Sequence, residues 1–376
     1  MPITENLSHT LEAPSLAPGS GRFRAEVVER PAAEWDALAA GFGDMCMEQT
    51  IAFMGARWSK LHPLGLLLRE EGVAEPVAIT LVLLVTLPVI GAGMAYVKFG
   101  PLWRKASAAT DPQILYAMLE ALKHEFSGKR RLLLRIMPPA DPGQEEIWRD
   151  ALARTGFVFH AQASDRERYL VDLTLSEEEQ LASLGASWRA HLKKASRELE
   201  IEELPLASGL PVFLSLYRGM LARKRFADHH GIGDLPKIAA QAGSAIGMRL
   251  FIASYRGNPV VGSIVIGSGE RVFVPFSATS DEALALRAGY ALRWAIIGRL
   301  RGSGVRWLDL GGAEGDAGLR SYKLGNVGKR GRVAEIPGEF DFSPNSLSSA
   351  AARAIEIGRG LVRTPALKKI VAYLPI

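Results

Sequence analysis

Apolar and polar positions along the second half of the chain form a regular series of short strands followed by one long helix. The alternation predicts strands over 249–255, 260–267 and 271–278, separated by turns that contain glycine. The segment 287–301 predicts a helix buried against a sheet, because it is almost wholly apolar along Ala291, Leu292, Trp294, Ala295, Ile296, Ile297 and Leu300. A further strand is expected over 305–311. These elements indicate a mixed α/β domain.

The first half of the chain repeats this order. A hairpin that begins at 64–69 leads into apolar strands, and a helix begins at Thr110 or Asp111 and ends near Gly128. A strand over 131–137 comes next. Both halves follow the order hairpin, third strand, long helix, glycine and strand. The sequence therefore predicts two copies of one α/β fold.

One uncharged segment has a second interpretation. Residues 76–97 carry no charge and nearly match the ~20 residues that span a bilayer. However, Pro88 divides the segment, Gly91 and Gly93 follow, and β-branched residues fill its first part. We therefore expect two buried strands in place of a transmembrane helix.

Composition adds limits on size, compartment and partners. The chain has 376 residues, of which 48% are hydrophobic and 23% charged, and this length favours two domains. The single cysteine, Cys46, excludes an internal disulfide, and residues 1–20 lack the apolar core of a secretory signal, so a cytosolic protein with a flexible first segment is expected. A net charge of +5 favours anionic partners such as tRNA, nucleotides or a membrane surface, although a solvated basic surface has the same composition.

Several chemistries lack their motifs. The sequence has no phosphate-binding loop, no dinucleotide-binding glycine pattern and no nucleophile elbow. The adjacent pair His229-His230 cannot face one metal site, and Cys46 has no evident histidine partner. Direct group transfer remains. It needs a helix N-terminus for the donor's phosphates, a backbone donor for the oxyanion and a route for the amine proton.

Four stretches carry a resemblance to a known family. They are "YVKFGPLW" (Tyr96 to Trp103), "SWRAHLKKASRELEIEEL" (187–204), "FLSLYRGMLARKRFADH" (Phe213 to His229) and "WLDLGGAEGDAGLRSYKLGNVG" (Trp307 to Gly328). In this order they resemble the Fem family of aminoacyltransferases, which build peptidoglycan cross-bridges from aminoacyl-tRNA.

The resemblance implies a fold and a division of the chain. The expected fold class is α/β, with two tandem GNAT-like N-acyltransferase domains whose mixed, mostly antiparallel sheets are flanked by helices. The expected division is a tail over 1–20, domains over 21–172 and 173–342, and a basic helical tail over 343–376.

The resemblance also implies roles for particular residues. Lys323 would act as a cation toward a phosphate or the donor's carbonyl oxygen, beside Asp309 at the end of a strand. Arg223 and Arg225 would hold an anionic substrate. The remaining assignments are substrate contacts by Tyr322, Lys98, Gly100 and Trp103, donor contacts by Arg287, Gly289 and Tyr290, and a catalytic position at Ser277, where strand backbone would donate to the oxyanion. No metal and no cofactor beyond the donor substrate is expected.

Plainer alternatives stand beside these assignments. Lys323 is also compatible with a solvated lysine, and Asp309 with a side chain that bonds the N–H groups of its own turn. The run Arg223-Lys224-Arg225 is also compatible with a solvated basic patch.

Departures from the family pattern leave the donor open. Trp103-Arg104 stands where some relatives carry an acidic residue, and no long helical arm for tRNA is present. The acyl-CoA pattern [QR]-x-x-G-x-[GA] ends correctly at Gly289 but has Leu286 at its charged position. The expected reaction is aminoacyl transfer from aminoacyl-tRNA to an amine-bearing cell-envelope precursor. The alternatives are an acyl-CoA-dependent N-acyltransferase of polysaccharides or lipids, and a non-catalytic membrane or RNA adaptor.

The last segment, 343–376, is basic and amphipathic. Arg353, Arg359, Arg363, Lys368 and Lys369 stand against Glu356, a net charge of +4 (five minus one). Such a segment is typical of peripheral contact with an anionic membrane, and packing against the second domain is the alternative.

Overall fold

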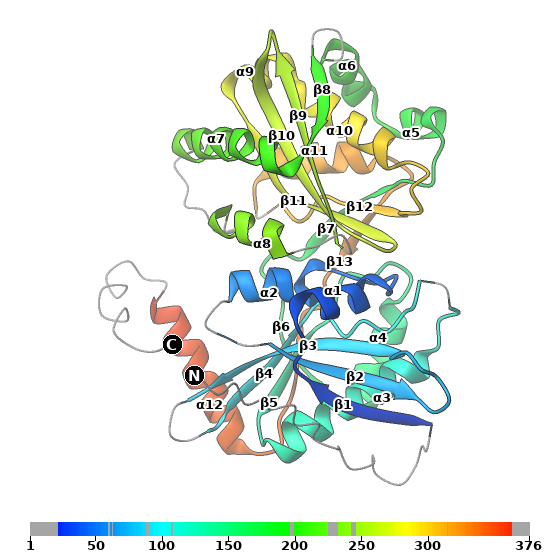
Figure 1. The fold of residues 1–376 in the computed structure, drawn as a ribbon, viewed down its shortest axis with the longest axis vertical. Helices are drawn as coiled ribbons and strands as arrows, with labels where there is room; N and C mark the ends of the chain where they lie inside the picture. Colours follow the sequence, from blue (N-terminus) through cyan, green and yellow to red (C-terminus); the bar gives the residue numbers. More distant parts are fainter. Residues whose placement is uncertain are drawn as a thin grey trace, which may run out of the picture.

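The computed structural model describes residues 22–362 except 59–60, 62, 88–90, 107, 196–198, 225–231, 242–245 and 314, with side chains up to 357. Its elements form two domains, each built on a seven-stranded sheet (Figure 1). The expected α/β fold class, two domains whose mixed, mostly antiparallel sheets are flanked by helices, is confirmed.

The first sheet has the strand order β1-β2-β3-β4-β5-β14-β6, and only its β4–β5 pair is parallel. The Asp111 side chain accepts from the backbone N–H of Gln113 and begins the long helix α3, as the sequence predicts. The elements are β1 (Phe23–Val28), α1 (Ala32–Ala40), α2 (Ile51–Arg57), β2 (Leu64–Glu70), β3 (Ala78–Thr86), β4 (Gly93–Lys98), α3 (Pro112–Leu122) with a π-helical end (Lys123–Lys129), β5 (Leu133–Met137), α4 (Glu145–Arg154), β6 (Val158–Ala161), β14 (Glu339–Phe342) and α12 (Ser346–Val362).

The second sheet has the order β13-β7-β12-β11-β10-β9-β8, again with one parallel pair, β11–β12. The helix that the sequence predicts over 287–301 is α10. The elements are β7 (Glu167–Asp172), α5 (Glu177–Ser183), α6 (Ala186–Ala195), β8 (Glu200–Leu204), α7 (Leu206–Lys224), α8 (Leu235–Gln241), β9 (Gly247–Tyr255), β10 (Asn258–Gly267), β11 (Arg271–Thr279), α9 (Asp281–Leu286), α10 (Ala288–Leu300), β12 (Trp307–Asp309), α11 (Ala317–Val327) and β13 (Arg332–Glu335).

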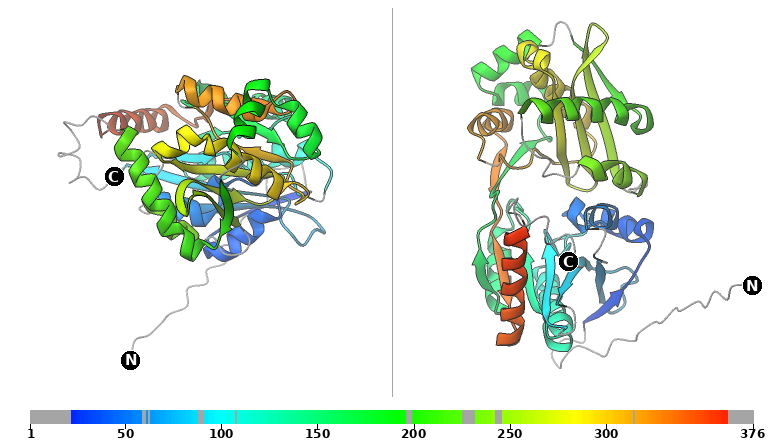
Figure 2. Two further views of the ribbon diagram at one scale, coloured as in Figure 1. Left: turned by 90° about the horizontal axis from the view of Figure 1, so that it is seen from above. Right: turned by 90° about the vertical axis from the view of Figure 1, so that its left-hand side faces the viewer.

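The two sheets exchange one strand each. Strand β7 follows the first-domain strand β6 in sequence but pairs with β12 and β13 of the second sheet. Strand β14 follows the second-domain strand β13 but lies between β5 and β6 of the first sheet. The connections cross the junction between the domains (Figure 2). Strand pairing thus differs from the expected division at 172 and 342, because each sheet is completed by a strand from the other half of the chain.

The second sheet buries both of its faces. Ile264 and Ile266 of β10 join the hydrophobic cluster that contains Phe213 of α7, whereas Val265 joins the cluster that contains Leu292 of α10. Because successive side chains of a strand point to opposite faces, α7 and α10 cover opposite sides. The α7-side cluster continues into the first domain.

Three segments test the secondary-structure predictions. The uncharged segment 76–97 forms β3 and β4, and within the described residues no helix has both the length and the apolar character to cross a bilayer. The residues Ser176 and Glu179 predict a capping box at the start of a helix; the capping box is present, but the helix divides at Gly185 into α5 and α6. The six glycines of 307–328 favour turns, but the second half of this stretch forms the helix α11, which begins at the cap Asp316.

The final helix α12 packs on the first domain. Ala352 lies against Met94 and Leu133 of strands β4 and β5. The alternative expected for the tail, packing on the second domain, is therefore wrong for α12, because the exchanged strand β14 has already returned the chain to the first sheet. Residues 363–376, the most basic part of the tail, lie outside the described residues.

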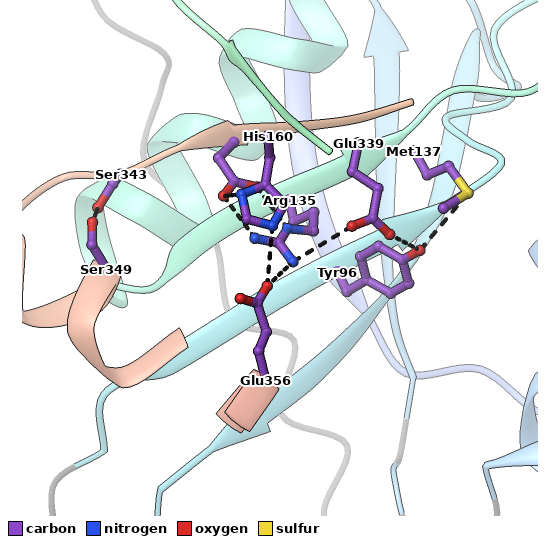
Figure 3. Close-up of polar contacts among 9 residues, drawn as sticks. Tyr96, Arg135, Met137, His160, Glu339, Ser343, Ser349 and Glu356 are labelled. Carbon is purple, nitrogen blue, oxygen red and sulfur yellow. Dashed lines mark hydrogen bonds and ion pairs between the residues drawn. The ribbon is translucent and has the colours of Figure 1, made fainter. Parts of the chain in front are cut away.

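A charged cluster holds α12 in place (Figure 3). Arg135 of β5 donates to both oxygens of Asp341 at 2.7 and 2.8 Å, and its guanidinium also pairs with Glu356 of α12. His160 lies 3.3 Å from Asp341 and 3.3 Å from Glu356. The cluster borders a cavity of about 330 Å³ between α12 and the sheet.

Candidate functional site

A glycine turn follows β12 in the second domain. The Asp309 carboxylate is 1% exposed, and its Oδ1 accepts from the backbone N–H of Gly311 at 2.8 Å. Gly311 has a φ of +70°, which favours glycine. At Gly312 a β-carbon would lie 1.7 Å from the Asp165 carboxylate, so any other residue there would require the Asp165 side chain to move. The predicted turn bond of Asp309 is present, and it fixes the turn against a second acidic residue.

Lys323 of α11 reaches back to this turn. Its Nζ donates to the backbone carbonyl of Gly312. Burial, and to a smaller extent the neighbouring Arg293 cation, lower the pKa of Lys323 to about 8, although Asp309 and Asp165 act in the opposite direction. The solvated-lysine alternative does not describe this side chain.

The start of α10 lies beside Tyr322, the residue before Lys323. Arg287 adopts the left-handed conformation, with φ 57° and ψ 27°, and gives α10 no side-chain cap. The Tyr322 hydroxyl donates to the Gly289 carbonyl at 2.8 Å, and the Tyr322 ring meets Tyr290 edge to face at 5.3 Å. The structure thus brings together the start of α10 and the segment of α11 that contains Tyr322 and Lys323. The sequence pointed to each of these segments but not to their contact.

Arg293 belongs to this neighbourhood, and the sequence analysis missed it. It lies in α10, is 6% exposed, and its Nε and Nη1 have no hydrogen-bond partner. The available signal was a cation in the middle of α10, flanked on both sides by apolar residues that are buried, since such a charge is costly unless it serves a partner.

Ser277 lies on a strand edge that opens near this site. Pairing between β11 and β12 ends at Phe273, so from 274 onward no described strand covers that edge. The Ser277 side chain is exposed and lies 2.9 Å from the Ser263 hydroxyl of β10. Backbone near Ser277 thus remains a candidate oxyanion donor.

The basic pair at the end of α7 is only partly described. The Arg223 guanidinium donates to Asp281 at 2.8 Å and to the Thr279 carbonyl at 3.0 Å, which ties α7 to the end of β11. Arg225 lies outside the described residues. A substrate contact by Arg223 would require that it exchange these partners.

The glycine-proline segment lies in the first domain. Lys98 sits over the Trp58 ring, 5.5 Å from its centroid, and a β-carbon at Gly100 would lie 2.6 Å from the Gln49 side chain. The substrate contact expected of Trp103 is wrong, because its side chain is 1% exposed within the first-domain core.

An ionic chain crosses the domain junction and ends at Asp309. Arg104 donates to Glu270 at 3.2 Å and to Asp141 at 3.1 Å. Arg271 lies 3.8 Å from Asp141 and 3.8 Å from Asp309. Sequence reasoning missed this chain because its members come from four separate segments.

A small polar cavity of about 60 Å³ borders the ionic chain, with Asp44 and Cys46 on its first-domain side. Burial raises the pKa of Asp44 to about 7 and raises the pKa of Asp141. The Cys46 thiol donates to the Phe99 carbonyl, and burial raises its pKa, which fits a packed side chain. Among the described residues, no group of three or more His, Cys, Asp or Glu side chains is arranged to hold a metal ion.

Comparisons with known proteins identify similar domains and folds. Residues 186–324 match the model of the acetyltransferase (GNAT) domain. No curated protein matches the sequence significantly. Among solved structures, FemX superposes with a TM-score of 0.71 at 14% identity, and covers 88% of this chain and 100% of its own. The chain has a Fem-type tandem GNAT fold.

Two further structures share this Fem-type tandem GNAT fold. The C-terminal domain of a putative lysylphosphatidylglycerol synthetase from Agrobacterium fabrum has a TM-score of 0.55 at 15% identity, over 88% of this chain and 97% of its own. A conserved protein of unknown function from Bacteroides thetaiotaomicron has a TM-score of 0.59 at 13% identity, over 84% of this chain and 98% of its own. The match to the acetyltransferase (GNAT) domain supports an acyltransferase.

Proposed function

We propose that this protein forms an amide by direct transfer of an aminoacyl group from aminoacyl-tRNA to an amine of a peptidoglycan-type cell-envelope precursor. The observation that carries the proposal is the Lys323 ammonium, half-buried at the Gly311-Gly312 turn with its pKa lowered to about 8. A cation withdrawn from solvent interacts more strongly with a developing negative charge than a solvated one.

In the proposed reaction the acceptor nitrogen attacks the ester carbonyl of the donor. A C–N bond forms, the C–O bond to the terminal ribose breaks, and the amine proton passes to the leaving oxygen or to solvent. Lys323 would stabilise the oxyanion together with backbone N–H groups near Ser277 on the open edge of β11. Positioning of the two substrates supplies the remaining rate enhancement.

The aminoacyl donor is supported by likeness in fold. FemX matches this chain over both domains, and the name of the lysylphosphatidylglycerol synthetase contains an aminoacyl group, lysyl. The amine-bearing precursor follows from the proposed amide product. Peripheral contact with an anionic membrane through residues 363–376 belongs to the same proposal, since it would bring the enzyme to a lipid-linked acceptor.

An acyl-CoA donor is the second candidate, and one observation favours it. The matching family model is that of an acetyltransferase domain, and its residues 186–324 include Gly289 and Lys323. In this case the bond broken is the thioester C–S bond, and the acceptor would be an amine of a polysaccharide or lipid.

The test compares Lys323→Ala with Lys329→Ala, an exposed lysine just beyond α11. Each full-length variant is offered charged tRNAs and acyl thioesters separately, and the products are identified by mass spectrometry. We expect Lys323→Ala to keep its circular dichroism spectrum and melting temperature but to lose transfer by roughly 100-fold or more. Lys329→Ala should retain full turnover.

Ribonuclease treatment separates the two donors, because only the tRNA reaction requires intact RNA. Undiminished turnover in Lys323→Ala would falsify the role of Lys323. Transfer from thioesters alone would replace the leading function with the second.

A further inference from the structure

The outer side of α12 exposes apolar side chains. Leu347 and Ile357 are 61% and 63% exposed, and Ala350 and Ala354 between them are exposed as well. These four positions are spaced by three, four and three residues, so they follow one another along one side of the helix. We call these four residues the α12 stripe.

Helix α4 of the same domain has the arrangement that is usual for a helix on a solvated surface. Its exposed positions are mostly charged: Glu145, Glu146, Arg149, Asp150 and Arg154. Among the described side chains of α12, only Arg353 and Glu356 carry a charge, and Glu356 is paired with Arg135 of β5. A continuous exposed apolar surface is typical of sites that contact another protein or a membrane.

Three contacts hold α12 on the outside of the first domain, so that the stripe keeps its direction (Figure 2). Near the helix start, the Ser348 hydroxyl donates to the backbone carbonyl of Arg131, just before β5. In the middle, Ala352 packs against β4 and β5, and further along Glu356 pairs with Arg135 (Figure 3). The surface is therefore formed before any partner binds, which lowers the entropy cost of binding.

The charges beside the α12 stripe are positive. Arg353 is exposed and forms no ion pair within the described part of the chain. Beyond it, the sequence over 358–376 contains no acidic residue and four cations: Arg359, Arg363, Lys368 and Lys369. An anionic bilayer matches this combination, because its headgroups attract cations and its acyl boundary takes up apolar side chains. A second copy of the chain fits less well, since a symmetric contact would bring the same cations together.

We propose that the α12 stripe and Arg353 dock on an anionic lipid bilayer, with Leu347 and Ile357 inserted at the headgroup boundary. The assignment rests on the proposed function, in which the enzyme reaches a lipid-linked acceptor. It adds the surface that makes the contact, and it turns the outer side of the first domain, on which α12 packs, toward the bilayer.

The test measures binding of the full-length protein to vesicles by co-sedimentation. One set of vesicles is pure phosphatidylcholine, and the other is an equal mixture of phosphatidylcholine and phosphatidylglycerol. We expect wild type to bind the mixed vesicles at least ~10-fold more tightly than the neutral ones. The double variant Leu347→Ser/Ile357→Ser should bind the mixed vesicles about 10-fold more weakly than wild type, and Arg353→Gln about 5-fold more weakly.

The matched control is Leu284→Ser. Leu284 lies in α9 of the second domain and is 55% exposed, so the change removes a similar side chain from a surface outside the proposed contact. This variant should bind vesicles like wild type. All variants should keep the melting temperature of wild type, because the substituted side chains are exposed.

A fluorescent label reports insertion directly. Ile357→Cys, labelled with a dye that is sensitive to polarity, should show a blue shift when the mixed vesicles are added, whereas labelled Leu284→Cys should not. The native Cys46 is 3% exposed, so the dye reacts with the introduced thiol.

Two results would overturn the assignment. The first is unchanged vesicle binding by the double variant, or a label at position 357 that stays in water while the protein sediments with the vesicles. The second is a wild-type dimer in sedimentation velocity that the double variant dissociates, which would assign the stripe to a second copy.

Transfer to a water-soluble acceptor is scored apart from vesicle binding. If vesicle binding depends on the stripe but no donor gives transfer, the proposed reaction fails and the docking surface stands. If transfer is found while the double variant binds vesicles normally, the docking surface fails and the reaction stands.

Discussion

Lys323 depends on a small set of neighbours for its properties. Gly311 and Gly312 let the backbone pass close to Asp165 and to the lysine, so that the ammonium meets a carbonyl in place of water. Burial and Arg293 both disfavour its charge, and burial has the larger effect. The result is an ammonium group that gains or loses its proton at a pH near 8.

The pH dependence of transfer should report this residue. Burial lowers the pKa of Lys323 from 10.5 to about 8, and the proposed role needs its charged form, so kcat/KM should fall as pH rises through about 8. Lys323→Arg keeps its charge throughout and should not show this fall. Activity that rises through pH 8 would instead assign Lys323 as a base.

The free energy of unfolding should rise with pH over the range in which transfer falls. Between pH 8 and 10.5 the folded state holds fewer protons on Lys323 than the unfolded state, so the free energy of unfolding should rise with pH there. Urea unfolding of wild type and Lys323→Met at both ends of this range measures it. The difference between the two proteins should shift in favour of wild type as pH rises.

Helices α6, α10 and α11 form the support for the site. Trp188 of α6 is 5% exposed and meets Tyr290 of α10 edge to face at 4.9 Å. Gly325 of α11 lies against the same tryptophan. One buried ring therefore fixes the spacing of the two helices that carry Gly289 and Lys323.

Two glycine-to-alanine changes test this support. A β-carbon at Gly325 would lie 2.5 Å from Trp188 Cδ1, whereas at Gly298 of α10 it would meet nothing within 4 Å. Alanine favours helix by ~1 kcal/mol over glycine, so Gly298→Ala should raise the free energy of unfolding by up to that amount. Gly325→Ala should lower it by about 1–3 kcal/mol through overpacking, and should reduce transfer as α11 moves. Equal effects in chemical denaturation would show that Trp188 does not set the spacing.

At the scale of the whole molecule, the two domains are joined in three ways. They exchange strands β7 and β14, they share the hydrophobic cluster that contains Phe42 and Phe213, and an ionic chain runs between them. The chain ends at Asp309, so a change at the junction reaches the glycine turn through charged contacts.

Arg104→Gln should weaken this junction. The change removes the hydrogen-bonded partner of Asp141, which is 6% exposed and keeps only the longer contact with Arg271 at 3.8 Å, and it removes the partner of Glu270 in the other domain. Breaking a buried pair leaves an uncompensated charge, so we expect a loss on the order of 3 kcal/mol in the free energy of unfolding.

The adjacent Lys105→Gln is the control for this change. Lys105 forms an ion pair with Glu75, which is 76% exposed, and the loss of this pair should cost no more than ~0.5 kcal/mol. Thermal unfolding of both variants measures the contrast, and similar melting temperatures would contradict a stabilising role for the chain.

The order of strands and helices was determined by the sequence itself, because alternation, caps and apolar runs act over a few residues. The hairpins of the second half, helix α10 and the strands within 76–97 all follow from such local patterns. The importance of Lys323, Gly289 and Tyr322 could be predicted only through family resemblance. Their convergence depends on how α10 and α11 pack, which no local pattern encodes.

Tertiary structure alone decided the strand exchange, the place of α12 and the partners of each charge. The local patterns of β7 and β14 predict a strand but do not say which sheet it joins. Each strand joins the sheet whose neighbouring strands are left without a partner at that position. The surroundings of the Trp103 and Arg293 side chains could not be predicted from the sequence either. Whether an aromatic ring is core or contact, and whether an arginine is paired, depends on neighbours distant in sequence. Burial and charge pairing are properties of the packed molecule, so the sequence determined which groups exist and the fold determined what each of them meets.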